Sequence, residues 1–202
     1  MWISHIPYTE AEGRLRSLYD RIKGPDDNVD NIMLAHSLRP HSMEGHMALY
    51  KYVLHHASNV IPKWFLETLG VYVSSLNACA YCVDHHFAGL TRLLKSDDRA
   101  AAIRTALQAD VFADAFTPAE SAALRYAEAL TLRPRAQDEL RTRLEALRAA
   151  GFDDGRILEV NQVVAYFNYA NRTVLGLGVT TDGDNLGLSP GNSDNPEDWS
   201  HG

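Results

Sequence analysis

Positive charge is scarce in this sequence. The 202 residues include 19 Lys and Arg against 26 Asp and Glu, which gives a formal net charge of −7. Proteins that bind nucleic acid or anionic lipid need the opposite balance, because they must neutralise phosphate groups. We therefore expect no nucleic-acid partner.

Long hydrophobic runs are also missing. No segment has the run of about 18 apolar residues that a membrane-spanning helix needs. The start, Met1-Trp2-Ile3-Ser4-His5, lacks a basic stretch followed by an apolar one. We expect a cytoplasmic protein without membrane association.

Cysteine is rare, and Cys79 and Cys82 are the only two. In a reducing compartment such a pair is more often catalytic, redox-sensing or metal-binding than a structural disulfide. The two residues between them also close too small a loop for a disulfide to stabilise the chain much. The pair therefore indicates chemistry rather than structure.

Strand patterns are nearly absent, whereas helical periodicity recurs along the chain. Apolar residues at spacings of three and four, separated by helix-start and helix-stop residues, predict an all-α fold. The expected helices cover residues 9–22, 32–38, 42–55, 62–76, 80–94, 97–107, 119–130, 134–150 and 157–177.

One domain over residues 1–180 is the simplest organisation for a chain of this length. Over residues 181–202 the composition changes to Gly, Asp, Asn, Ser and Pro, which cannot form a core of its own. We expect this polar tail to pack on the body of the protein or on a neighbouring subunit.

The two cysteines form a Cys79-x-x-Cys82 motif at the expected start of a helix. Residues three apart on a helix are neighbours, and the unpaired N–H groups at a helix start favour a thiolate at Cys79. His86 follows Cys82 by four residues and shares its helix face, where it can exchange a proton with the thiol. His85 is rotated away and is the weaker candidate.

Glu67 is the fourth candidate, provided that the chain breaks between it and the thiols. On one unbroken helix, Glu67 and Cys79 would lie about 18 Å apart, too far to share a proton. Asn77 tolerates the left-handed conformation that ends a helix and is also a good helix cap. We expect the break there, and a Glu67–His86–cysteine relay if the two helices fold together.

These residues resemble a known family. Glu67 followed by Cys79-x-x-Cys82-x-x-x-His86 is similar to the alkyl hydroperoxidase D and carboxymuconolactone decarboxylase superfamily. The peroxidase-related subgroup fits best over the stretches Ile6-Pro7, Asn31-Ile32, His36-Ser37-Leu38-Arg39-Pro40, Tyr166-Phe167-Asn168-Tyr169-Ala170-Asn171-Arg172 and Gly176-Leu177-Gly178. The resemblance implies a helical bundle that assembles as a homo-oligomer, a trimer or a hexamer.

The resemblance also implies a reaction and a role for each residue. Cys82 would attack a hydroperoxide, Cys79 would resolve the product to a disulfide, and His86 and Glu67 would relay protons. Helix-dipole reasoning alone favours Cys79 as the more acidic thiol, and we follow the family in ranking Cys82 first. An external dithiol, a lipoyl protein or a thioredoxin-like protein, would reduce the disulfide, with no cofactor and no metal.

One departure from the family concerns Tyr81, which stands where the best-known member has a histidine. A tyrosine hydroxyl donates hydrogen bonds but is a poor base near neutral pH, so the relay can differ here. Tyr81 and His85 are therefore secondary candidates.

Two other interpretations of the motif stay open. The dithiol could serve a redox sensor or an oligomeric binding scaffold that reacts once without turnover. Alternatively, the two thiolates, His86 and Glu67 could hold zinc, since these four ligand types satisfy a tetrahedral site.

Overall fold

The computed structural model describes residues 1–191, 193–195 and 197–199; residues 192, 196 and 200–202 of the expected tail lie outside the described residues. Within the described residues the fold is all-α, as the periodicity predicts, with nine α-helices and no β-strand. The helices are α1 (Gly13–Ile22), α2 (Asn31–Leu34), α3 (Pro40–Leu54), α4 (Lys63–Leu76), α5 (Ala80–Leu94), α6 (Asp97–Ala109), α7 (Pro118–Leu132), α8 (Gln137–Ala149) and α9 (Asp154–Leu177). Two 3₁₀ turns, Tyr8–Glu10 and Pro25–Asp27, flank α1.

Helix α4 is the centre of the molecule. Every residue from Phe65 to Ser74 is buried, and the helix packs on α3, α5, α6, α7 and α9. A helix that is apolar on all sides belongs in a core. Glu67 is the one ionisable carboxylate within this buried run, so it must have partners inside the protein.

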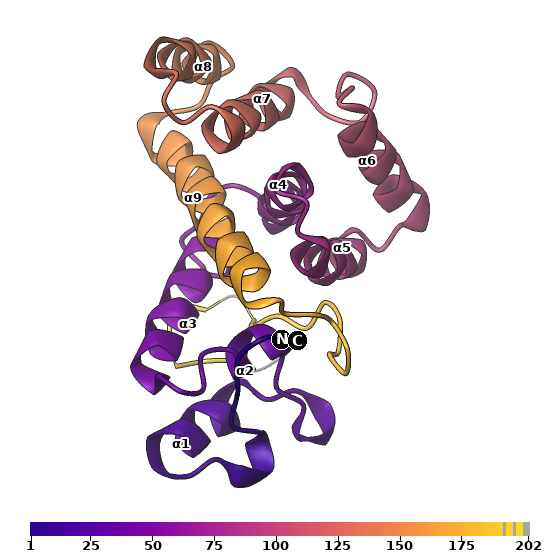
Figure 1. Cartoon of the computed structure of the whole chain (residues 1–202). Helices are drawn as coiled ribbons and strands as arrows, with labels where there is room; N and C mark the ends of the chain where they lie inside the picture. The colour runs from indigo at the N-terminus through magenta and orange to yellow at the C-terminus, as the bar shows by residue number, and fades with distance from the viewer. Residues whose placement is uncertain (192, 196, 200–202) are drawn as a thin grey trace.

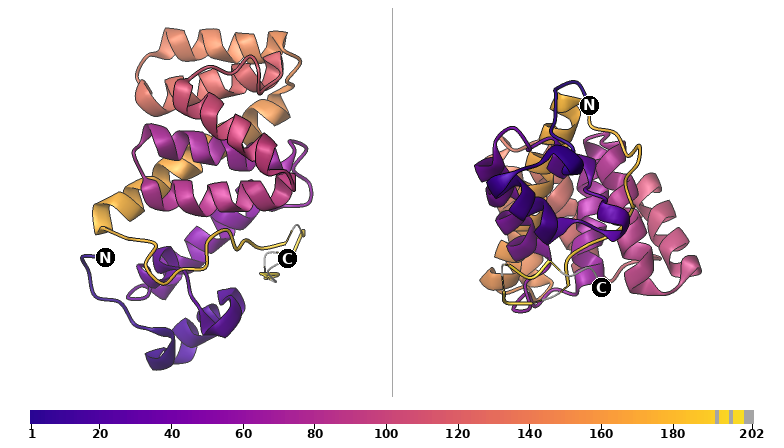
Figure 2. Two further views of the ribbon diagram at one scale, coloured as in Figure 1. Left: turned by 90° about the vertical axis from the view of Figure 1, so that its right-hand side faces the viewer. Right: turned by 90° about the horizontal axis from the view of Figure 1, so that it is seen from below.

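Helix α9 ties the two ends of the molecule together. Figure 1 shows it running from α7 and α8 past α4 to α3, and it packs on all of these helices. The left view of Figure 2 shows α4 and α5 as a stacked pair, with the segment after α9 running back below them. Helices α4 and α5, which carry the candidate site residues, therefore both pack on α9.

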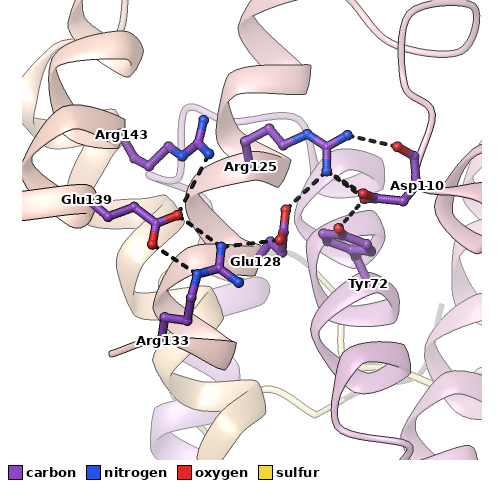
Figure 3. Close-up of polar contacts among 7 residues, drawn as sticks. All are labelled: Tyr72, Asp110, Arg125, Glu128, Arg133, Glu139 and Arg143. Atoms are coloured by element: carbon purple, nitrogen blue, oxygen red, sulfur yellow. Dashed lines mark hydrogen bonds and ion pairs between the residues drawn. The ribbon is translucent and has the colours of Figure 1, made fainter. Parts of the chain in front are cut away.

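A chain of polar contacts joins several of the helices (Figure 3). It begins at Asp110, which accepts a hydrogen bond from the Tyr72 hydroxyl at 2.7 Å and pairs with Arg125 at 2.6 Å. The chain continues through Glu128 of α7, Arg133, and Glu139 and Arg143 of α8. These contacts connect α4, α7 and α8 with the end of α6.

Several helix boundaries differ from the sequence prediction by two residues or more, and three of these differences have a local cause. Helix α8 begins at Gln137 rather than at Pro134, because residues 133–136 form a turn with main-chain bonds of 2.9 Å and 3.0 Å. The first expected helix begins only at Gly13, after a separate 3₁₀ turn. The second, expected over residues 32–38, ends at Leu34 and continues as tight turns.

Other end signals were predicted correctly. Thr117 and Glu120 form the expected capping box at the start of α7, and Asp153 caps α9 by accepting the Arg156 N–H at 2.8 Å. Among the described helices, none combines the length and the apolar character needed to cross a membrane.

Candidate active site

The chain breaks between α4 and α5, as the site requires. Helix α4 ends at Leu76, and α5 begins at Ala80 directly after Cys79. The left-handed residue is Ala78, with φ of +55°, and not Asn77 as the sequence suggested. The Asn77 amide instead donates to Asn171 on α9 at 2.9 Å, so its side chain fixes the turn through a tertiary contact.

The break lets α5 fold back along α4 and brings Glu67 to His86. The Nδ1 atom of His86 lies 2.7 Å from the Glu67 Oε2 atom, and the Glu67 side chain is only 2 % exposed. The ring of His86 packs edge-on against Phe167, with 4.6 Å between ring centroids. This contact orients the imidazole and leaves its Nε2 atom for other chemistry.

The two cysteines are reduced and buried, and their environments differ. Cys79 caps the N-terminus of α5, while Cys82 lies one turn inside it. The Cys82 thiol donates a hydrogen bond to the Cys79 sulfur, and this lowers the pKa of Cys79, with help from the Cys82 backbone N–H and the Asn171 amide. The same sharing, together with burial, raises the pKa of Cys82 well above its ordinary range. The reduced pair therefore places its first negative charge on Cys79.

Tyr81 and His85 point to a partner that the sequence did not reveal. Both contact the Asp184 Oδ2 atom, the Tyr81 hydroxyl at 2.8 Å and the His85 Nε2 atom at 3.0 Å. The backbone N–H of Asn31 donates to both Asp184 oxygens, at 3.0 Å and 3.1 Å. Asp184 lies in a polar segment whose composition carries no signal of this role, since only packing brings it to α5.

A small cavity of about 60 Å³ gathers most of these groups. Glu67, Cys82 and His86 line it, together with Tyr81 and His85. Cys79 is not part of this lining, although both cysteines belong to one apolar cluster with Val174 and Val179. A molecule in the cavity therefore meets Cys82 before Cys79.

His55 is a second buried imidazole beside Glu67 that sequence reasoning did not single out. It is fully buried, neither ring nitrogen has a hydrogen-bond partner in the described part of the chain, and its Nε2 atom is 4.0 Å from the Glu67 Oε1 atom. Burial, then the charges of Lys63, His86 and Lys51, lowers the pKa of His55 well below its ordinary value. A neutral His55 leaves Glu67 paired with His86.

The zinc interpretation finds no support in the geometry. Within the described residues, the ligand atoms of Cys79, Cys82, His86 and Glu67 do not form a group of three within 4.8 Å of one another. Asp30, His85 and Asp184 do form such a group. The Asp184 oxygens already accept hydrogen bonds from Asn31 and Tyr81, so this group is explained as a hydrogen-bonded cluster.

The part of the chain that contains these residues matches a known protein family. Residues 40–129, which extend from α3 into α7, match the model of the carboxymuconolactone decarboxylase family. This range contains Glu67, Cys79, Cys82 and His86. The uncharacterized protein YdfG of Bacillus subtilis (strain 168) is 25 % identical over 145 residues, which are 71 % of this chain and 91 % of that protein.

Solved structures share the fold over most of the chain. The alkylhydroperoxidase AhpD core of an uncharacterized peroxidase-related protein from Ralstonia eutropha JMP134 superposes with a TM-score of 0.67 at 25 % identity, covering 83 % of each chain. The apo debrominase Bmp8 superposes with a TM-score of 0.66 at 20 % identity, covering 83 % of this chain and 85 % of that one. At that identity the second likeness shows the fold alone.

Proposed function

The chain belongs to the alkyl hydroperoxidase D and carboxymuconolactone decarboxylase superfamily, and from this premise we propose that it is a thiol-dependent peroxidase. The observation that carries the proposal is one cavity lined by the Cys82 thiol and by the hydrogen-bonded Glu67–His86 pair. A dithiol peroxidase uses a thiolate, a second thiol and a route for protons. Cys82 and the Glu67–His86 pair line the cavity, and Cys79 precedes Cys82 by one helical turn.

We assign the attack on the peroxide to Cys82 and the resolving step to Cys79. Cys82 lines the cavity, whereas Cys79 does not. The Cys79 thiolate accepts the hydrogen bond of the Cys82 thiol, so it is the nearest base for the Cys82 proton. The Cys82 thiolate forms when this proton moves to Cys79, because the resting pair holds its negative charge on Cys79.

Each turn of the proposed cycle cleaves one peroxide O–O bond and forms one Cys79–Cys82 disulfide. Cys82 passes its proton to Cys79 and attacks one peroxide oxygen, so that an S–O bond forms, the O–O bond breaks and a sulfenic acid results. The departing alkoxide takes a proton through His86 and leaves as an alcohol. Cys79 then gives its proton to the His86–Glu67 pair and attacks the Cys82 sulfur, and hydroxide leaves and is protonated to water.

Regeneration needs two electrons from outside the chain. We propose an external dithiol donor, a lipoyl protein or a thioredoxin-like protein, which reduces the Cys79–Cys82 disulfide by thiol exchange. We also propose that the chain works as a homo-oligomer, a trimer or a hexamer, as the family resemblance implies.

Turnover separates this proposal from a redox sensor. With excess peroxide and dithiothreitol, the enzyme should consume many equivalents of peroxide per chain. Consumption that stops at one equivalent would overturn the peroxidase and leave the sensor. Metal analysis of protein purified without chelator tests the zinc interpretation, which predicts about one zinc per chain.

The cysteine roles are separated by single substitutions. Cys82→Ser should abolish the reaction with peroxide, while Cys79→Ser should still form a sulfenic acid that dimedone traps at Cys82. The opposite pattern would exchange the two assignments.

The relay is tested by Glu67→Gln, which keeps the shape of the side chain and removes its charge. General acid–base groups contribute about 10²–10⁴-fold to rates, so we expect the oxidation rate of the reduced protein to fall by about 100-fold. Stopped-flow tryptophan fluorescence measures this rate. Glu159→Gln is the matched control, because Glu159 accepts the backbone N–H groups of Val60 and Ile61 away from the cavity. An equal effect of both substitutions would remove Glu67 from the relay.

A further inference from the structure

The segment after α9 forms one wall of the thiol cavity. Gly187, Leu188, Ser189 and Pro190 all line it, together with Cys82 and His86. Figure 2 shows this segment leaving the end of α9 and running back below α4 and α5. Access to Cys82 therefore depends on where the segment lies.

Polar contacts hold this wall at both ends. At the start, the Asp184 carboxylate, 2 % exposed, accepts hydrogen bonds from Asn31 and Tyr81 and contacts His85. Further along, Arg92 of α5 donates to the Leu186 carbonyl at 2.8 Å, and Lys63 of α4 donates to the Pro190 carbonyl at 3.3 Å. The wall is thus tied to α2, α4 and α5.

Between these ends the wall lies in close contact with the body. Gly187 has φ of +77°, and a Cβ added there would lie 2.8 Å from the Gly89 backbone nitrogen of α5. The side chain of Leu188 packs beside Gly24, where an added Cβ would lie 2.6 Å from the Leu188 Cδ1 atom. Only glycines permit such an approach, so the segment packs directly on α5 at Gly187.

The volume of the cavity limits the size of a molecule that can lie beside the thiol. The cavity measures about 60 Å³. A cavity of about 150 Å³ holds a benzene ring, whereas a single water molecule needs only about 10–15 Å³ of cavity volume. The space beside Cys82 is therefore suited to a molecule of a few heavy atoms.

We propose that the segment Asp184–Pro190 is a size-selecting wall, which admits hydrogen peroxide and short-chain alkyl hydroperoxides to Cys82 and excludes aryl and fatty-acid hydroperoxides. This specificity rests on the proposed peroxidase function. Leu188 limits the space directly, and Asp184 acts as a positioning residue that holds the wall in place.

The first experiment compares hydrogen peroxide, ethyl hydroperoxide and cumene hydroperoxide as oxidants of the reduced protein. Each rate is divided by the rate of free dithiothreitol with the same peroxide, which removes intrinsic reactivity. The normalised rate for cumene hydroperoxide should be at least tenfold below that for hydrogen peroxide. Leu188→Ala and Asp184→Asn should each raise the cumene-to-hydrogen-peroxide ratio at least fivefold.

Asp182→Asn is the matched control for the anchor. Asp182 is exposed and its carboxylate accepts a hydrogen bond only from Thr180 among the described contacts, so its substitution should leave the ratio within twofold of the wild type. An equal normalised rate for all three peroxides, or a ratio that Leu188→Ala does not change, would overturn the wall.

The second experiment tests the wall without peroxide. In a Cys79→Ser background, Cys82 should react with methyl methanethiosulfonate at least tenfold faster than with an aryl methanethiosulfonate, relative to free thiol, and Leu188→Ala should reduce this difference. Retained size selection without any peroxide reaction would overturn the peroxidase and support the wall. Loss of size selection with peroxide turnover intact would overturn the size-selecting wall and support the peroxidase function.

Discussion

The two cysteines differ in what surrounds each sulfur. Cys79 receives hydrogen bonds from the Cys82 thiol, from a backbone N–H and from Asn171, which together hold its pKa below the ordinary thiol value. Cys82 donates its proton to Cys79 and is almost fully buried, so its pKa is raised. Acidity and access to the cavity are therefore divided between the two residues.

Asn171→Leu should raise the pKa of Cys79, because it removes one donor to the thiolate without changing the volume of the side chain much. The thiolate absorbance at 240 nm, followed against pH, measures the shift, and the alkylation rate near pH 7 should fall with it. Ser74→Ala is the control, since Ser74 accepts a hydrogen bond from the Asn171 amide at 3.0 Å but shifts the pKa of neither cysteine. An unchanged titration in Asn171→Leu would contradict the assigned donor.

His46 is a buried imidazole that stays neutral. Burial, then the charge of His36, lowers the pKa of His46 to about 3. An unfolded histidine has a pKa of about 6.5, so between these values the unfolded chain binds a proton that the folded chain lacks. Folding stability should therefore decrease as pH falls below about 6.5.

His46→Gln tests this linkage. Between pH 7 and pH 5 the wild type should lose about 2 kcal/mol of unfolding free energy at this residue alone, from about 1.4 kcal/mol per pH unit below the unfolded pKa. Guanidinium unfolding at both pH values measures the loss, which should be smaller in the variant. His5→Gln, at an exposed position, should keep the wild-type difference. The same loss in His46→Gln as in the wild type would contradict a neutral His46.

At the scale of elements, the crossing of α4 and α9 sets the position of Glu67. Gly70 lies at this crossing, where an added Cβ would be 2.2 Å from the Phe167 ring. Phe167 in turn packs against His86. The close approach of two helices therefore fixes the distance between the carboxylate and the imidazole.

Gly70→Ala should destabilise the protein by about 1–3 kcal/mol, because overpacking a rigid ring outweighs the better helix propensity of alanine. The matched control is Gly45→Ala in α3, where an added Cβ meets no atom within 4 Å. That substitution should raise stability by about 1 kcal/mol. Chemical denaturation measures both, and a stabilised Gly70→Ala would show that Phe167 moves freely.

The break between α4 and α5 shows how far local patterns reach. The sequence correctly placed a break before Cys79, because Glu67 and the thiols could meet in no other way. It assigned the left-handed conformation to Asn77 rather than Ala78, because the contact between Asn77 and Asn171 joins residues 94 positions apart. Such a contact leaves no local trace in the sequence.

At the scale of the whole molecule, two sets of polar contacts join elements that are distant in the sequence. The network of Figure 3 joins α4, α7 and α8. The Asp184 cluster joins the segment after α9 to α2 and α5. The first set supports the fold, and the second closes the cavity.

Arg125→Gln should lower the unfolding free energy by about 1–2 kcal/mol, since Arg125 pairs with Asp110 and Glu128 and stacks on Phe112. The loss should shrink in 1 M salt, because these charges are partly exposed and screened. Arg148→Gln, in a more exposed pair, should cost less than about 0.5 kcal/mol. Equal losses for the two variants at low salt would argue against a cooperative network.

The sequence by itself determined the all-α class, most helix ends and the grouping of Cys79, Cys82 and His86. These features depend on neighbours within a turn or two, where spacing alone fixes geometry. The tertiary structure decided the rest: Glu67 meets His86 across 19 residues, and Asp184 meets Tyr81 across 103. Contacts of this range depend on how whole helices pack, since the free energy that forms them is distributed over the core rather than stored in a local pattern.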